Sequence, residues 1–191
     1  MKHLYLMRHG QTLFNVRHKI QGWCDSPLTE LGISQALKAK ECLKDIHFDH
    51  AYSSTSERCC DTLELITDMP YKRLKGLKER NFGLFEGESE DLNPKKGMDI
   101  TYEDLFPHYG GEYRSDVTKR MCETLTEIMR KDDHETVLAV SHAGACFAFF
   151  LSIADPDLIF STGGFTNCSI LHFTFEHDTF HFVEIIRPDV G

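Results

Sequence analysis

The chain alternates between two hydrophobic patterns: short continuous apolar runs, and longer segments in which apolar residues recur every three or four positions. The short runs predict strands at 3–7, 51–54, 71–77 and 136–141. The helical periods predict helices at 30–46, 57–68, 115–131 and 145–154. Two further runs alternate apolar and polar residues, which predicts an antiparallel hairpin over 169–176 and 179–186.

Strands that alternate with helices and end in a hairpin indicate an α/β fold. We expect a three-layer sandwich with a mostly parallel central sheet, an antiparallel edge strand and helices on both faces. Residues 80–113 depart from both patterns, because glycine, proline, asparagine and acidic residues dominate there. We interpret them as a short lid excursion, with one short helix at 101–106, from a single domain that spans residues 1–191.

The start of the helix after 51–54 carries an unusual cation. Ser54 and Glu57 match the S-x-x-E capping box, which predicts a helix that begins at Thr55 with Arg58 in its first turn. A cation there opposes the helix dipole at a cost of about 0.3–1 kcal/mol. The placement is explained if an anion lies between the helix N-terminus and the guanidinium. The alternative is an exposed arginine whose small cost is tolerated.

The overall charge narrows the class of partner. A net charge of -9 argues against nucleic acid or an anionic membrane as the main partner, so an anionic substrate would need a few local cations. Seven cysteines cannot all pair, and we expect free thiols in a reducing cytosol. No run approaches the roughly 20 apolar residues of a membrane span. We therefore expect a cytoplasmic protein.

Polar residues of an unusual kind follow three of the predicted strands. They are RHG at 8–10, TSER at 55–58 and HAG at 142–144. In open α/β sheets, ligands bind beyond the carboxyl ends of strands. We therefore expect two imidazoles and two guanidiniums to converge on one pocket. The small residues after His142, of which Ala143 is the first, would let a ligand approach the backbone closely.

Five motifs occur in order and at suitable intervals: RHGQTLFN, QGWCDSPLTELG, SSTSER, LKERNFGLFEG and SHAG. From residue 3 to about 175 the chain strongly resembles the histidine phosphatase superfamily, in the cofactor-dependent phosphoglycerate mutase branch. The resemblance implies that His9 is the nucleophile and forms a phosphohistidine. It also implies which residues surround the phosphoryl group: Arg8, Arg58 and His142 as charge-stabilising groups, and Asn15, Gln21 and Gly22 as the rest of the pocket.

The implied chemistry is physically reasonable. A neutral imidazole nitrogen can attack phosphorus, and nearby guanidiniums disfavour the imidazolium form while they bind the phosphoryl oxygens. The family pattern places the proton donor at Glu79, and we expect Glu86, seven residues later, to be structural. We expect no metal and no other cofactor. Histidines at 172, 177 and 181 suggest a metal-binding alternative, but their spacing is irregular.

The family contains both phosphatases and mutases, and the 80–113 excursion bears on the choice between them. Mutases of this branch usually carry a longer, basic insertion. Residues 84–107 instead contain two lysines, Lys95 and Lys96, and seven acidic residues: Glu86, Glu88, Glu90, Asp91, Asp99, Glu103 and Asp104. Because such a segment would repel a bisphosphorylated acid, we expect a phosphatase that acts on a small phosphorylated metabolite. The basic run at 72–80 could counter this repulsion.

Two alternatives stay open at this point: a phosphoglycerate mutase, and a non-catalytic protein that binds a phosphorylated ligand. Retention of Glu79 disfavours the second, because a pure binder needs no acid. The family often shows GGES before the long helix, where this chain has Tyr113. We expect Tyr113 to reach the leaving group. We expect a monomer or a homodimer, for which the hairpin edge strand offers one interface.

Overall fold

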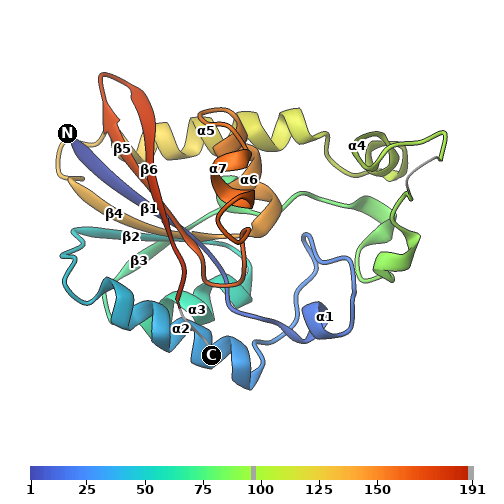
Figure 1. The fold of residues 1–191 in the computed structure, drawn as a ribbon, viewed down its shortest axis with the longest axis horizontal. Helices are drawn as coiled ribbons and strands as arrows, with labels where there is room; N and C mark the ends of the chain where they lie inside the picture. Colours follow the sequence, from blue (N-terminus) through green and yellow to red (C-terminus); the bar gives the residue numbers. More distant parts are fainter. Residues whose placement is uncertain (96–97, 189–191) are drawn as a thin grey trace.

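The computed structural model describes residues 1–95 and 98–188, which build a six-stranded sheet in the order β3-β2-β4-β1-β5-β6 (Figure 1). Four strands run parallel: β1 (Lys2–Arg8), β2 (His50–Ser54), β3 (Tyr71–Leu74) and β4 (Thr136–Ser141). The hairpin strands β5 (Ile170–Glu176) and β6 (Thr179–Ile186) pair antiparallel beside β1. The predicted mostly parallel sheet with an antiparallel edge is confirmed.

Helices cover both faces of the sheet, as the sequence predicts (Figure 1). One face carries α2 (Glu30–Leu43) and α3 (Glu57–Ile66), and the other carries α5 (Arg114–Met129) and α6 (Ala143–Leu151). The described residues also form three one-turn helices: α1 (Leu13–Val16), α4 (Tyr102–Leu105) and α7 (Asp157–Phe160). Helices α1 and α4 lie beyond the carboxyl ends of the parallel strands, where the pattern of residues predicts a ligand.

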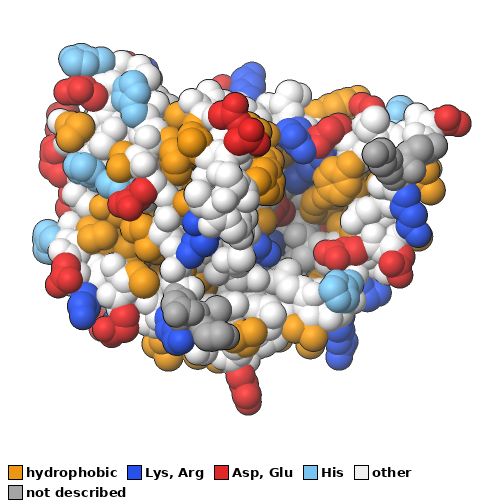
Figure 2. Space-filling model, in the orientation of Figure 1, with side chains coloured by type: hydrophobic (Ala, Val, Ile, Leu, Met, Phe, Trp, Pro, Cys, Tyr) orange, Lys and Arg blue, Asp and Glu red, His pale blue; other side chains and the backbone are white. Residues whose placement is uncertain are grey.

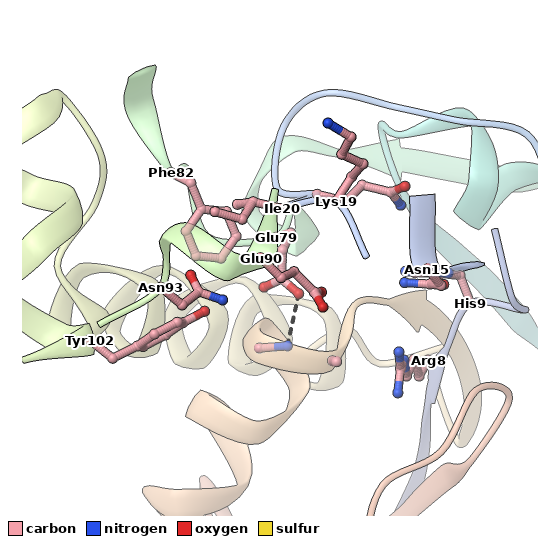
Figure 3. A pocket seen from close by; sticks show the side chains of 13 residues that line it. Arg8, His9, Asn15, Lys19, Ile20, Glu79, Phe82, Glu90, Asn93 and Tyr102 are labelled. Carbon is pink, nitrogen blue, oxygen red and sulfur yellow. Dashed lines mark hydrogen bonds between the residues drawn. The ribbon is translucent and has the colours of Figure 1, made fainter. Parts of the chain in front are cut away.

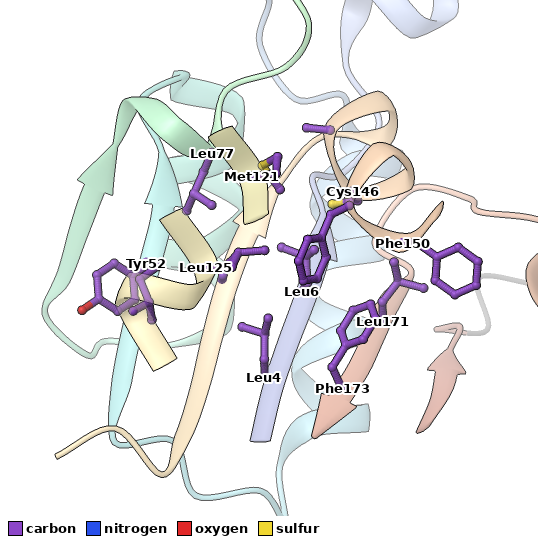
Figure 4. Close-up of a cluster of buried hydrophobic side chains, with 14 of the residues drawn as sticks. Leu4, Leu6, Tyr52, Leu77, Met121, Leu125, Cys146, Phe150, Leu171 and Phe173 are labelled. Atoms are coloured by element: carbon purple, nitrogen blue, oxygen red, sulfur yellow. The ribbon is translucent and has the colours of Figure 1, made fainter. Parts of the chain in front are cut away.

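The core is divided by the sheet because successive side chains of a strand point to opposite faces. Along β1, Leu4 and Leu6 pack toward α5 and α6 (Figure 4). Tyr5 and Met7 pack toward α2 and α3 on the opposite face. The apolar stripe predicted on α5 is fully buried: Val117, Met121, Leu125, Ile128 and Met129. Full burial of such side chains is typically worth about 1.5–3 kcal/mol each.

The predicted capping box at the start of α3 is wrong. The helix begins at Glu57, and its N-cap residue, Ser56, makes no side-chain capping bond. A carboxylate from another segment takes that role, because Asp25 Oδ2 accepts a hydrogen bond from the Glu57 N–H at 2.6 Å. The Ser54 hydroxyl instead lies 2.8 Å from His142 Nε2. Arg58 does stand in the first turn, as expected.

The 80–113 segment contains the predicted short helix, α4, and three 3₁₀ turns: Gly83–Phe85, Glu90–Leu92 and Phe106–Tyr109. Its aromatic residues form a small core of their own, in which Phe82 packs edge-on against Phe106 at 4.7 Å between ring centroids. Lys96 lies outside the described residues. Within the described residues, none of the helices is long and apolar enough to cross a membrane.

Candidate active site

A cavity of about 190 Å³ opens at the carboxyl ends of the parallel strands. Figure 2 shows this face of the molecule hollowed near its centre, with basic side chains visible inside the hollow. The walls include six residues that the sequence nominates: Arg8, His9, Asn15, Gln21, Glu79 and Ala143 (Figure 3). They also include four polar side chains that it does not nominate as site residues: Lys19, Glu90, Asn93 and Tyr102.

The position and tautomer of His9 are fixed by its neighbours. Its Nδ1 lies 2.7 Å from the Gly10 carbonyl oxygen, which can only accept, so Nδ1 carries the proton. The lone pair is therefore on Nε2, which accepts a hydrogen bond from Arg58 Nε at 3.3 Å. The His9 carbonyl is itself held by the Asn167 side-chain amide at 3.1 Å. Sequence reasoning missed Asn167, for which the chain gives no local signal.

Arg58 is completely buried and every N–H of its guanidinium is engaged. Besides His9, it donates to the carbonyl oxygens of Gly22 and Cys24, to Asp25 Oδ1 at 2.8 Å and to His142 Nδ1 at 2.8 Å. A buried cation needs such partners. The guanidinium thus joins the QGWCD loop, α3 and the end of β4 around the His9 ring, and the exposed-arginine alternative is wrong.

His142 is held in the opposite tautomer to His9. Because an arginine only donates, His142 Nδ1 must accept from Arg58, and its Nε2–H then donates to the Ser54 hydroxyl. The two imidazole rings lie 5.4 Å apart, edge to face. Ser54 is therefore a positioning residue that the sequence indicated only as a helix cap.

Both histidines are electrostatically biased toward the neutral form. Burial is the largest cause that lowers the pKa of His9, and the Arg58 and Arg8 charges lower it further. Burial, followed by the Arg58 charge, likewise holds the pKa of His142 well below its usual value. The His9 Nε2 lone pair therefore stays available at neutral pH.

Free hydrogen-bond donors gather at the His9 end of the cavity. Arg8 donates from one terminal nitrogen to the Phe165 carbonyl oxygen at 2.8 Å, but its buried Nε has no partner among the described residues. The same is true of Gln21 Nε2 in the part of the chain that the structure describes. Buried donors without partners are costly, and an anion at this end would satisfy them.

Glu79 is buried at the edge of the cavity. Its oxygens accept hydrogen bonds from the Arg80 and Gly144 N–H groups, both at 2.8 Å. Burial nevertheless raises the pKa of Glu79, and it outweighs the lowering by those bonds and by Arg58. A Cβ on Gly144 would lie 2.7 Å from Glu79 Oε1, so only glycine allows the carboxyl group this close to α6.

Gly22 of the QG motif and Glu86 of the FEG motif hold other residues of the site in place. Gly22 does not line the cavity, and its carbonyl oxygen holds Arg58 instead. A Cβ on Gly22 would lie 2.1 Å from the Arg80 carbonyl oxygen. Glu86 accepts from the N–H groups of Gly22, Trp23, Cys24 and Phe82, which is the structural role expected of it.

Tyr113 is not brought to the site. It stands before α5 with an exposed fraction of 56%, and the tyrosine that does line the cavity is Tyr102, from α4. The three histidines of the hairpin also stay apart. His172 is buried, stacked on Tyr5 and 3.0 Å from His3, whereas His177 and His181 are exposed. They form no metal-ligand cluster within the described residues.

Comparisons with known proteins agree with this geometry. The family model of the histidine phosphatase superfamily (branch 1) matches residues 4–187. The uncharacterized phosphatase PhoE of Bacillus subtilis is 30% identical over 80% of this chain and 79% of its own length. A probable phosphoglycerate mutase, GpmB of Proteus mirabilis, is 32% identical over 74% and 70%. The structure of a phosphoserine phosphatase from Entamoeba histolytica, in complex with 3-phosphoglyceric acid, superposes with a TM-score of 0.80 and 29% identity, covering 97% and 96%.

Proposed function

The chain belongs to branch 1 of the histidine phosphatase superfamily, and we propose that it is a metal-independent phosphatase that hydrolyses a small phosphomonoester through a phosphohistidine on His9. The observation that carries the proposal is the orientation of His9. The Nδ1–H bond to Gly10 leaves Nε2 unprotonated, with its lone pair at the donor-rich end of the cavity. A neutral nitrogen held in this way is a competent nucleophile for phosphorus.

The first half-reaction would transfer the phosphoryl group to His9. As the Nε2–P bond forms and the bond from phosphorus to the ester oxygen breaks, the free donors Arg8 Nε and Gln21 Nε2 donate to the phosphoryl oxygens. Arg58 Nε, which donates to His9 Nε2 in the free protein, would transfer its hydrogen bond to a phosphoryl oxygen at the same time. Protonated Glu79 gives its proton to the leaving alkoxide. In the second half, the Glu79 carboxylate takes a proton from water, and the hydroxide attacks phosphorus and releases His9.

The charges around the cavity favour a phosphatase over a mutase. None of the lysines and arginines at 72–80 lines the cavity: Lys78 lies over the Trp23 ring, and Arg80 pairs with Glu103. Glu90 does line it and would repel a phosphoglycerate carboxylate. Phosphoglycerate mutase is the second candidate, supported by the relative from Proteus mirabilis and by Lys19, a cation in the cavity wall.

The test is hydrolysis of p-nitrophenyl phosphate in the presence of a chelator. We expect the wild-type protein to release nitrophenolate and His9→Ala to fall to background, with an acid-labile phosphoryl group trapped on the wild type only. His47→Ala, which removes an exposed histidine, is the matched control and should keep full activity. Activity that survives in His9→Ala, or that the chelator abolishes, would refute the mechanism. Interconversion of phosphoglycerates without hydrolysis would instead establish the mutase.

A further inference from the structure

The cavity has a second end, away from Arg8 and His9, where its polar groups differ in kind. This distal end is formed by Glu90, Asn93 and Tyr102 of the 80–113 segment, together with Lys19 (Figure 3). The free groups at the His9 end are donors, as a phosphate requires. Two of the groups at the distal end, a carboxylate and an amide oxygen, are acceptors.

Glu90 is held in place by the backbone around it. Its N–H donates to the His18 carbonyl oxygen at 2.8 Å, and the neighbouring Ile20 N–H donates to the Glu88 carbonyl oxygen at 2.8 Å. The Ser89 hydroxyl caps the 3₁₀ turn that begins at Glu90. Among the residues that the structure describes, the carboxylate contacts only the exposed His18 ring, at 3.5 Å, and such a surface pair contributes little to stability. The backbone is therefore fixed while the carboxylate stays free to take a ligand.

Asn93 adds an unsatisfied acceptor to the same end of the cavity. Its Oδ1 is buried and has no hydrogen-bond partner among the described residues. Leaving such an oxygen unpaired destabilises the free protein, so a ligand that donates to it would bind more tightly. A leaving group that carried only acceptors would leave both Asn93 Oδ1 and the Glu90 charge uncompensated.

We propose that this distal end selects phosphomonoesters whose leaving alcohol carries an ammonium group, with Glu90 as the counter-ion and Asn93 Oδ1 as a second acceptor. The ammonium would face the carboxylate while the phosphoryl group occupies the donor-rich end beside His9. Phe82 and Ile20 line the same cavity and would contact the carbon atoms of the leaving alcohol. The substrate class is therefore a phosphorylated amino alcohol.

Lys19 could bind a second charged group on the same leaving alcohol. Its ammonium makes no hydrogen bond within the described residues, and its backbone pairs with Ser89 next to Glu90. A carboxylate on the same leaving group would have this cation as its partner. An amino acid that is phosphorylated on its hydroxyl would thus engage Glu90 and Lys19 together, whereas a plain amino alcohol would engage Glu90 alone.

This inference rests on the proposed function, and matched substrates test it separately. O-phosphoethanolamine and 2-hydroxyethyl phosphate differ by an ammonium in place of a hydroxyl, and so do O-phosphoserine and 3-phosphoglycerate. We expect kcat/KM to be about tenfold or more higher for the ammonium member of each pair, the value of one charge-assisted hydrogen bond. Glu90→Gln should bring both ratios close to one. Asp91→Asn, the same charge change at an exposed neighbour outside the cavity, should leave both ratios as they are.

The inference would be overturned by kcat/KM ratios near one in the wild type, or by an equal change of these ratios in Glu90→Gln and Asp91→Asn. Hydrolysis of p-nitrophenyl phosphate would still support the proposed function in either case. If the protein hydrolyses none of these esters, the proposed function fails. Calorimetric titration of His9→Ala with the same pairs then still decides the inference, since it measures binding without turnover. Preference for the ammonium member that disappears in His9→Ala/Glu90→Gln supports it, and equal affinities refute it.

Discussion

The Glu79 carboxyl group lies among groups that pull its proton affinity in opposite directions. Burial raises its pKa, whereas the Arg80 and Gly144 N–H groups and the Arg58 charge lower it, and burial is the largest of these. The residue is therefore disposed to hold a proton closer to neutral pH than an exposed glutamate does. Such a group suits a proton donor to an alkoxide.

Replacement of Glu79 by glutamine should lower kcat/KM for an alkyl phosphate by about 10²–10⁴-fold, the usual contribution of a positioned acid. kcat/KM for p-nitrophenyl phosphate should fall far less, because it reports phosphoryl transfer to His9, in which nitrophenolate departs without a proton. With the wild type, kcat/KM for an alkyl ester should fall as pH rises through the raised pKa of Glu79, and this limb should be absent in the variant. Steady-state kinetics on the two esters measures both effects. Equal losses of kcat/KM on both esters would show that Glu79 is not the proton donor to the leaving group.

At the scale of single elements, the start of α3 depends on a residue far away in the sequence. The capping carboxylate is Asp25, which bonds both the Glu57 N–H and the Arg58 guanidinium. Asp25→Ala should lower the free energy of unfolding by about 1–3 kcal/mol, since it removes a helix cap and a charged hydrogen-bond partner. Glu57→Ala should stay within about 0.5 kcal/mol, as is usual for an exposed side chain. Urea denaturation compares the two, and the opposite order would restore the capping box.

The same helix shows which elements could be predicted from the sequence. Elements with a strong hydrophobic pattern lie within two residues of their predicted bounds. They include β4, a continuous apolar run that is buried on both faces, and α5, whose buried face repeats with the helical period. The one-turn helices α1 and α7 have too few residues for a period. The capping box failed because a local motif competes with tertiary contacts, and here Ser54 is engaged by His142.

The residues of the candidate site also differ in whether the sequence could predict their position. Arg8, His9 and His142 could be placed because they follow continuous apolar runs that predict strands, and Arg58 because it lies at the start of a periodic helix. Glu90, Asn93 and Tyr102 belong to a segment without periodicity, so their convergence depends on backbone bonds such as Glu90 N–H to the His18 carbonyl oxygen. Tyr113 was chosen by its place in a motif, but the turn before α5 directs it to solvent.

At the scale of the whole molecule, the site makes global stability depend on pH. His9 and His142 are both buried, and both have a pKa well below 6.5 in the folded protein, first because of burial and then because of Arg58. Above about pH 6.5 both rings are neutral in the folded and unfolded states, so they contribute no pH dependence. Below it, the unfolded chain takes up protons that the folded protein excludes. Each histidine should then lower the free energy of unfolding by about 1.4 kcal/mol per pH unit.

His142→Gln isolates this linkage, because glutamine cannot take up the proton. We expect the free energy of unfolding of the wild type to fall between pH 6.5 and 5. In His142→Gln the fall should be smaller by close to the contribution of one histidine, about 1.4 kcal/mol per pH unit. His47→Gln, at an exposed histidine, should follow the wild type. Glu79 acts in the opposite direction, since its raised pKa lets the folded protein bind a proton first as pH falls, but it does so equally in all three proteins. Urea denaturation at a series of pH values measures the free energy of unfolding of each protein. If it fell equally with pH in the wild type and in His142→Gln, the His142 ring would be protonated in the folded protein, and Arg58 would not keep that imidazole neutral.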